Sequence, residues 1–152
     1  MTDTSKKFAF VFGGSRGIGA SGVSRLAQDG YAVAFTYVSR EDKATQLADS
    51  VVAQGGEALP IKADSADPDE IRAAITTAVE QYGPIDVLVV NAGVFEFGMI
   101  DTMPLDKLDL ILSVNVRGVY LSIQAAVRHL KEGGRVITIG SNVAIRAGSP
   151  GV

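Results

Sequence analysis

The stretch FAFVFGGSRGIG, residues 8–19, decides the fold of this chain. Its first five residues are all apolar, which is typical of a strand buried on both faces of a sheet. Glycines follow at positions 13, 14, 17 and 19, and a helical pattern starts near Gly17. A strand, a glycine turn and a helix in this order indicate the start of an α/β domain.

The same alternation of apolar runs and helical patterns continues along the chain. Strands buried on both faces are predicted at residues 8–12, 32–37, 58–61, 85–90 and 136–139. The alternation favours parallel strands joined by right-handed crossovers. The predicted fold is therefore a doubly wound parallel sheet of Rossmann type, an α/β protein in three α/β/α layers, with residues 1–152 forming one domain.

Capping residues set the expected helix boundaries. The first helix is predicted to end before Gly30, where a glycine allows positive φ. The second should begin with Ser39 as its N-cap and Asp42 three positions later, and the third has Asp67 as the N-cap followed by Pro68. A fourth helix is expected over residues 105–131, stopped by two glycines at 133 and 134.

Composition narrows the classes of function. The 152 residues are 47% hydrophobic and 20% charged, which suits a globular domain. No cysteine and one histidine exclude disulfides, thiolate catalysis and a cysteine or imidazole metal cluster, so no metal site is predicted. A net charge of −3 gives no basic footprint for nucleic acid. With no stretch of about 18 uninterrupted apolar residues, we expect a soluble, cytoplasmic protein without a membrane partner.

Unusual residues follow each predicted strand. Because the carboxyl ends of parallel strands share one edge of the sheet, these loops should converge on a ligand site. The glycine loop can bring pyrophosphate against bare backbone at a helix N-terminus. The residues predicted to form this cofactor site are Gly13, Ser15, Arg16, Gly17, Ile18, Gly19, Ser39, Arg40, Asp64, Ser65, Asn91, Ala92 and Gly93.

The end of the second strand bears on which nicotinamide cofactor would bind. An Asp or Glu there usually holds the ribose 2′-hydroxyl of NAD, and residues 37–40, Tyr-Val-Ser-Arg, contain no acid. Arg40, with Arg16 and the Ser39 hydroxyl, could instead neutralise a 2′-phosphate. NADP(H) is therefore favoured over NAD(H). The competing interpretations are a helix cap for Ser39 and a solvated surface charge for either arginine.

Taken together, these motifs resemble the short-chain dehydrogenase/reductase family. The glycines at 13, 17 and 19, the Asn91-Ala92-Gly93 turn, Asn115-Val116-Arg117-Gly118 and Gly140-Ser141 follow one another as in that family. The resemblance implies that Asp64 contacts adenine and that Asn115 and Ser141 belong to a catalytic tetrad. It also implies hydride transfer between nicotinamide and a small carbonyl or alcohol substrate, and a homo-oligomer with the long helix at a dimer interface.

The sequence departs from the family pattern at two places. Phe12 stands where the family usually has a threonine that ties the first strand to the Asn-Ala-Gly turn, so we expect looser coupling or a packing substitute. The Tyr-x-x-x-Lys pair of the family is absent from the 152 residues. We therefore expect this chain to be the N-terminal part of a longer enzyme, incomplete at the C-terminal side of the sheet and inactive by itself, with residues 136–139 on an exposed apolar edge.

Two other functions stay open from the sequence. One is a non-catalytic nucleotide-binding module, whose ligand would be NADPH or a cyclic-di-GMP-like dinucleotide. It rests on the likeness of the glycine loop, residues 64–67 and residues 132–135 to a bacterial short-chain relative described as binding cyclic-di-GMP. The other is a structural dimerisation protein that uses the long helix as its surface.

Overall fold

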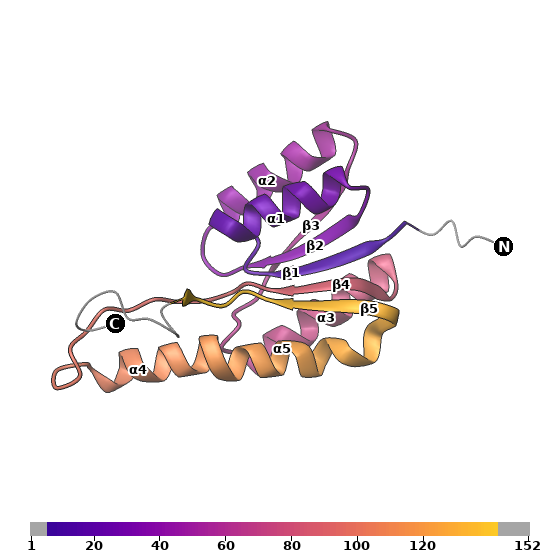
Figure 1. The fold of residues 1–152 in the computed structure, drawn as a ribbon. Helices are drawn as coiled ribbons and strands as arrows, with labels where there is room; N and C mark the ends of the chain where they lie inside the picture. Colours follow the sequence, from indigo (N-terminus) through magenta and orange to yellow (C-terminus); the bar gives the residue numbers. More distant parts are fainter. Residues whose placement is uncertain (1–5, 143–152) are drawn as a thin grey trace.

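The computed structural model describes residues 6–142 and shows strands and helices alternating along the chain (Figure 1). The strands are β1 (Phe8–Phe12), β2 (Ala32–Tyr37), β3 (Glu57–Lys62), β4 (Ile85–Val90) and β5 (Leu130–Thr138). The helices between them are α1 (Gly17–Gln28), α2 (Glu41–Ala53), α3 (Pro68–Tyr82), α4 (Leu105–Leu112) and α5 (Val119–Ala126). A π-helical segment, Ser113–Gly118, joins α4 to α5, and a short 3-10 turn, Val127–His129, ends the helical run.

All strand pairings are parallel, and the strand order in the sheet is β3-β2-β1-β4-β5. Helices α1 and α2 cover one face, while α3 and the helical run containing α4 and α5 cover the other (Figure 1). This three-layer, doubly wound architecture confirms the predicted fold class. The order reverses direction between β1 and β4, which is the position where such sheets bind ligands.

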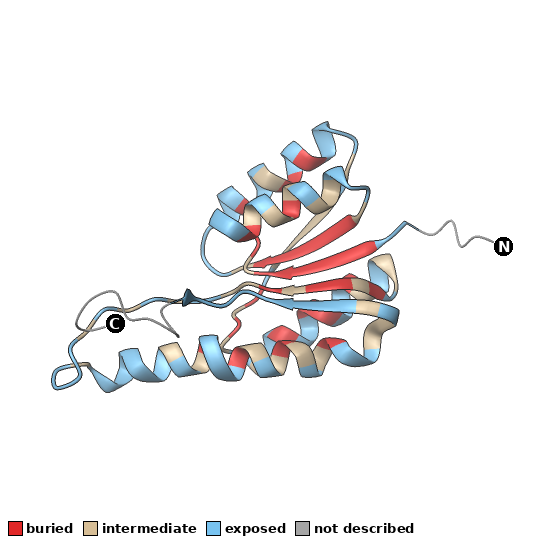
Figure 2. Ribbon diagram, in the orientation of Figure 1, coloured by how far each residue is buried: buried red, intermediate tan, exposed pale blue. Residues whose placement is uncertain are grey.

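Burial follows the position of each strand in the sheet (Figure 2). β1 is buried along its whole length, and β2 and β4 are mostly buried. β3 and β5 lie at the edges and are largely intermediate or exposed, so the prediction that every strand is buried on both faces was wrong for these two. The expected apolar edge is confirmed at Val136, Ile137 and Ile139, each more than 40% exposed.

The caps agree with the sequence at two helices and differ at a third. Gly30 has φ +89° just after α1, and the Asp67 carboxylate accepts hydrogen bonds from the backbone N–H groups of Asp69 and Glu70 at the start of α3. Ser39 is not the cap of α2, because Arg40 occupies that position and no side-chain cap bond forms. Asp42, the expected capping-box partner, pairs with Arg40 instead.

The last helix and strand differ most from expectation. The helical run ends at His129 rather than residue 131, and β5 begins at Leu130, six residues before the predicted start at 136. β5 pairs with β4 from Ile85 onward, with a register shift between Ile85 and Val87. Gly133 lies inside β5 with φ +76°, so the glycines mark an irregularity within the strand and not a helix stop.

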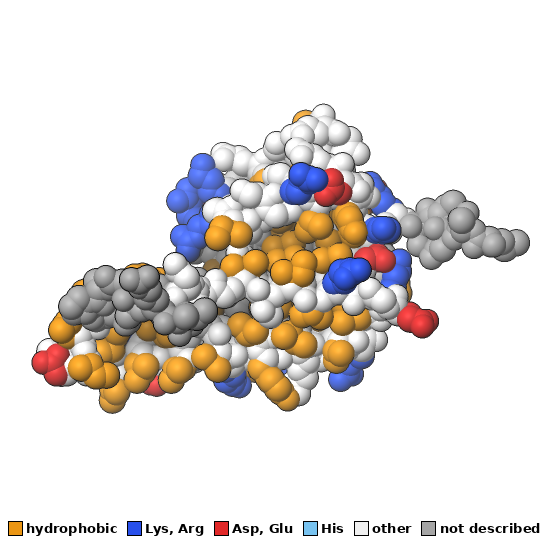
Figure 3. Space-filling view, viewed as in Figure 1, with side chains coloured by type: hydrophobic (Ala, Val, Ile, Leu, Met, Phe, Trp, Pro, Cys, Tyr) orange, Lys and Arg blue, Asp and Glu red, His pale blue; other side chains and the backbone are white. Residues whose placement is uncertain are grey.

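The helical run Leu105–His129 carries apolar side chains on its outer face as well as on the face toward the sheet. It is the one helix among residues 6–142 that is long and apolar enough to cross a membrane by length and composition. Its buried positions are Val114, Gly118, Ser122 and Ala126, and Ala126 belongs to the core under the sheet. Other apolar side chains of this run gather on its outer face (Figure 3), among them Leu105, Leu112, Val116, Tyr120 and Val127. Because one side packs on the sheet, we assign the run to a layer of the globular domain.

Ser122 gives a prediction about stability. Its hydroxyl is fully buried and is the one buried side-chain polar atom without a hydrogen-bond partner within residues 6–142. An unsatisfied buried hydroxyl destabilises a fold by about 1–3 kcal/mol. Ser122→Ala should therefore raise the free energy of unfolding by about 1 kcal/mol, measured by urea titration. Ser50→Ala, on the exposed face of α2, is the control and should change it by only a few tenths. A loss of stability in Ser122→Ala would contradict the prediction.

Candidate cofactor site

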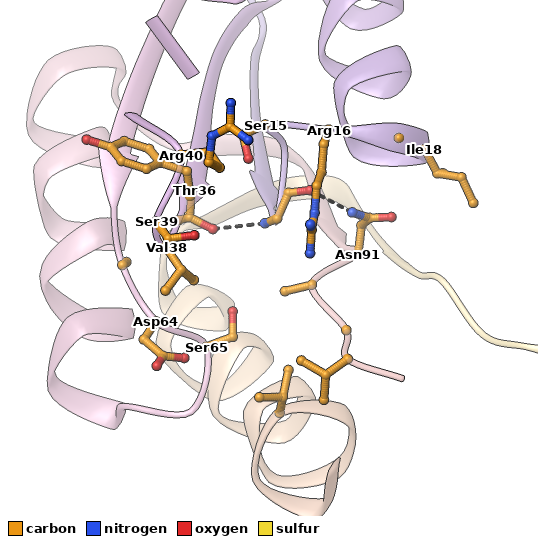
Figure 4. A pocket seen from close by; sticks show the side chains of 18 residues that line it. Ser15, Arg16, Ile18, Thr36, Val38, Ser39, Arg40, Asp64, Ser65 and Asn91 are labelled. Atoms are coloured by element: carbon orange, nitrogen blue, oxygen red, sulfur yellow. Dashed lines mark hydrogen bonds between the residues drawn. The ribbon is translucent and has the colours of Figure 1, made fainter. Parts of the chain in front are cut away.

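A pocket of about 430 Å³ opens at the carboxyl ends of β1, β2, β3 and β4, at the reversal of strand order (Figure 4). Twelve of the thirteen residues predicted for the cofactor site line it, and Gly19 is the one that does not. The twelve are Gly13, Ser15, Arg16, Gly17, Ile18, Ser39, Arg40, Asp64, Ser65, Asn91, Ala92 and Gly93. The structure therefore brings the converging loops together as the strand order requires.

The glycine loop is built for close backbone contact. Gly13 and Gly17 have φ values of +74° and +55°, which disfavour any other residue. A Cβ on Gly13 would stand 2.7 Å from the Ala92 Cα, and one on Gly19 would stand 2.1 Å from the Gly13 carbonyl oxygen. Both distances are shorter than the closest approach of non-bonded atoms. The first turn of α1 can therefore pack against the β1 and β4 loops only with glycine at these positions.

Two side chains tie the glycine loop to its neighbours. The Asn91 Nδ2 donates to the Gly13 carbonyl oxygen at 2.7 Å, and the Gly13 N–H donates to the Thr36 Oγ1 at 2.9 Å (Figure 4). Thr36 is 1% exposed and was missed by the sequence reasoning, although a hydroxyl in an otherwise apolar strand next to the glycine turn is a usable signal. These bonds couple the loop to β2 and β4.

Phe12 provides the packing substitute expected at the threonine position. Its side chain is fully buried, and its ring centroid lies 4.8 Å from that of Phe10. The Asn91 N–H still donates to the Phe12 carbonyl oxygen at 3.2 Å, so the backbone link between the two loops is present without a hydroxyl. This backbone bond and the bond from the Asn91 Nδ2 to the Gly13 carbonyl oxygen link the two loops without a threonine at position 12.

Positive charge stands at the rim of the pocket. Arg16 precedes α1 and Arg40 precedes α2, and both side chains are drawn over the pocket beside Ser15 and Ser39 (Figure 4). Among the lining residues of the described chain, Asp64 is the one acid. The Arg40 guanidinium donates from Nε and Nη2 to the two carboxylate oxygens of Asp42, at 2.9 and 2.8 Å. This hydrogen-bonded pair raises the pKa of Arg40 and lowers the pKa of Asp42 to about 2.

Asp64 and Ser65 close the side of the pocket formed after β3. The Asp64 carboxylate accepts from the Ala66 N–H at 2.8 Å, and the Asp64 N–H donates to Glu70 at 2.7 Å. Asp64 is thus both a turn residue and a pocket residue. Ser65 is buried, and its carbonyl oxygen would lie 2.3 Å from a Cβ on Gly118, so this loop rests on the π-helical segment.

Asn115 and Ser141, the two predicted catalytic residues, are not among the residues that line the pocket. Asn115 lies in the π-helical segment, where its Oδ1 accepts from the Val94 N–H at 2.9 Å and its Nδ2 donates to the Val94 carbonyl at 2.7 Å. This two-way contact fixes the chain that leaves the Asn91-Ala92-Gly93 turn. Ser141 follows the end of β5 and is exposed.

Six lining residues were not predicted from the sequence: Thr36, Tyr37, Val38, Ala63, Val94 and Val114. Apart from the hydroxyl of Thr36 and the phenol of Tyr37 these side chains are plain aliphatic groups, so only the strand order and loop geometry reveal their place. Within residues 6–142 no group of three or more His, Cys, Asp or Glu side chains is arranged to hold a metal ion.

A doubly wound parallel sheet with a glycine loop, an Asn-Ala-Gly turn and a pocket at the reversal of strand order defines the Rossmann class of α/β folds. Comparison with known families is more specific. The family model described as short chain dehydrogenase matches residues 7–152. The chain belongs to the short-chain dehydrogenase/reductase family.

Individual relatives agree with this assignment. The chain is 41% identical over 143 residues to an uncharacterised oxidoreductase of Methylorubrum extorquens, covering 94% of this chain and 58% of that protein. It is similar to the structure of a short-chain dehydrogenase/reductase from Serratia marcescens, with a TM-score of 0.94 and 51% identity over 95% of this chain and 59% of that one. A short-chain dehydrogenase from Burkholderia cenocepacia in complex with NADP gives a TM-score of 0.92 and 47% identity, with coverages of 95% and 59%. The chain thus spans a little under three fifths of the length of these relatives.

Proposed function

We propose that the protein is an NADP(H)-dependent oxidoreductase that transfers hydride between nicotinamide and the carbonyl or alcohol carbon of a small molecule. The observation that carries the proposal is the pocket itself, where Arg16 of the glycine loop and Arg40 after β2 supply positive charge and no acid follows β2 among the lining residues. The similar Burkholderia cenocepacia protein was solved with NADP, which supports the same class of cofactor.

The residues of the pocket fit a dinucleotide. Its volume of about 430 Å³ lies within the range of about 300–1,000 Å³ usual for small-molecule sites. Bare backbone at Gly13 and Gly17 and the N-terminus of α1 suit pyrophosphate. Arg16, Arg40 and the Ser39 hydroxyl suit a 2′-phosphate, and Asp64 suits the adenine end.

Asn115 and Ser141 are proposed to serve the reaction in different ways. Bound nicotinamide supplies or accepts the hydride. Ser141 would hydrogen-bond the substrate oxygen, while Asn115 positions the chain after the Asn91-Ala92-Gly93 turn through its contact with Val94. The proton-transferring Tyr-x-x-x-Lys pair does not occur within the 152 residues and is outside what this chain is proposed to supply. The complete protein is further proposed to be a cytoplasmic homo-oligomer.

Replacing Arg40 tests the cofactor assignment. Arg40→Ala should weaken NADPH binding about tenfold and leave NADH binding within twofold, because only NADPH carries the 2′-phosphate that a guanidinium binds by charge-assisted hydrogen bonds. Fluorescence titration of the complete protein with each cofactor measures both affinities. Arg72→Ala, on α3 and outside the pocket, is the matched control.

The same titration separates the competing functions. Equal loss for NADH and NADPH in Arg40→Ala would contradict a role in reading the 2′-phosphate. Tighter binding of cyclic-di-GMP than of either nicotinamide cofactor would replace the oxidoreductase proposal by a non-catalytic nucleotide-binding module.

A further inference from the structure

Asp42, beside the pocket, forms an ion pair with Arg40, one of the two arginines that line the pocket. Arg40 is the N-cap residue of α2 and Asp42 is the second residue of that helix, so the pair spans the turn by which β2 enters α2. The two nitrogen–oxygen contacts, at 2.9 and 2.8 Å, make a bidentate interaction. Arg40 lines the pocket and Asp42 does not. The carboxylate therefore approaches the guanidinium from outside the pocket.

The interaction uses the donors that an anion in the pocket would need. A guanidinium has five N–H donors, and two parallel N–H groups on one edge form its strongest contact with a carboxylate or a phosphate. Asp42 occupies such an edge through Nε and Nη2. A phosphate can then reach only the remaining donors, or it must displace the carboxylate.

The negative charge of Asp42 also opposes phosphate binding to Arg40 throughout the neutral pH range. The pKa of Asp42 is lowered to about 2, chiefly by the hydrogen bond from Arg40, so the carboxylate is ionised throughout the neutral range. A negative charge held against Arg40 repels a second anion that approaches the same guanidinium. Arg16 differs, because it has no carboxylate partner within residues 6–142.

We propose that Asp42 is a specificity-determining residue that weakens the preference for NADP(H) over NAD(H) by competing with the 2′-phosphate for Arg40. This inference rests on the proposed function, since it requires a nicotinamide dinucleotide in the pocket. NADH has no 2′-phosphate and leaves the Arg40–Asp42 pair intact, so Asp42 acts on one cofactor only. The opposite role, in which Asp42 orients Arg40 toward the phosphate, predicts the opposite sign.

Asp42→Asn in the complete protein distinguishes these roles by fluorescence titration with NADPH and NADH. We expect about threefold to fivefold tighter NADPH binding, the upper range for loss of one exposed ion pair, and NADH binding within twofold of the parent. The gain should shrink when KCl is raised toward 0.5 M, because salt screens exposed charges. It should stay constant between about pH 7.5 and 9, since neither Asp42 nor the 2′-phosphate, whose second pKa is about 6, titrates there.

Glu41→Gln is the matched control, because Glu41 is the neighbouring exposed acid at the start of α2 and the substitution removes the same charge. It should change the NADPH to NADH affinity ratio by less than twofold. An equal gain in Glu41→Gln would reduce the effect to net charge and overturn the inference. Unchanged or weaker NADPH binding in Asp42→Asn would overturn it as well.

The Arg40→Ala variant keeps this test separate from that of the proposed function. If Arg40→Ala lowers NADPH affinity and Asp42→Asn leaves it unchanged, the inference fails while the proposed function stands. If Arg40→Ala and Arg16→Ala both leave the NADPH to NADH ratio unchanged, the NADP(H) proposal itself fails. When Asp42 acts through Arg40, the gain from Asp42→Asn should fall below twofold in the Arg40→Ala background.

Discussion

Gly19→Ala should abolish nucleotide binding, with an affinity loss of at least about 100-fold. The added methyl carbon would stand 2.1 Å from the Gly13 carbonyl oxygen and 2.6 Å from the Asn91 Nδ2, between two atoms that now share a hydrogen bond. Both are held by β1 and β4, so relief requires α1 to move away from the sheet. Overpacking of this kind costs about 1–3 kcal/mol of stability, and the displaced loop no longer presents its N–H groups to phosphate.

The matched control for this substitution is Gly22→Ala in the same helix. A Cβ on Gly22 meets nothing within 4 Å, and alanine is the better helix former, so the free energy of unfolding should rise by up to about 1 kcal/mol. Urea titration and NADPH titration of both variants give the comparison. Parent-like NADPH affinity in Gly19→Ala would show that the close approach of α1 does not matter for binding.

Phe12→Thr, which introduces the residue usual in the family, should lower the free energy of unfolding by about 3 kcal/mol. Phe12 is fully buried beside Phe10, and removal of a buried phenyl ring costs about 3–5 kcal/mol. A threonine hydroxyl could add a hydrogen bond to the Asn91 turn, but such a bond contributes only about 0.5–1.5 kcal/mol. Packing therefore outweighs the tether in this protein, and urea titration measures the difference.

Phe95→Thr makes the same chemical change at a side chain that is 71% exposed, and it should alter stability by less than about 0.5 kcal/mol. If Phe12→Thr were as stable as the parent, the hydroxyl tether would be worth as much as the ring, and the account of Phe12 as a packing substitute would be wrong.

The centre of the sheet could be predicted from sequence because its strands are apolar on both faces. The bounds of β1, β2 and β4 agree with the predicted ranges. β5 could not be placed in the same way, because its first part, from Leu130 to Arg135, is polar and glycine-rich, and only Leu130 and Arg135 of this part pair with β4. Sheet pairing is a tertiary interaction that overrides local propensity, and periodicity does not report it.

The sequence predicts which loops form the pocket better than it predicts which side chains bond to one another there. The carboxyl ends of parallel strands meet by topology, which explains why twelve predicted residues line one pocket. Individual bonds depend on side-chain conformation instead. Whether Ser39 caps α2, whether Arg40 pairs with Asp42 and whether Thr36 accepts from Gly13 depend on side-chain geometry that residue types alone do not decide. The catalytic roles of Asn115 and Ser141 stay predictions.

The π-helical segment has a consequence for chain length. The four buried positions of the long run, 114, 118, 122 and 126, are spaced by four residues. In a regular α-helix the 12 residues from the first to the last would make about 3.3 turns, so these four side chains would rotate away from the sheet. About 11 residues make three turns, and the segment accommodates the one extra residue. Packing on the sheet does not need that residue. A relative one residue shorter between 113 and 118 could keep the buried stripe on a regular helix, but it would turn Asn115 away from Val94 or move it along the axis. A one-residue insertion or deletion between 113 and 118 therefore changes the position of Asn115 at the site and keeps the packing of the helix on the sheet.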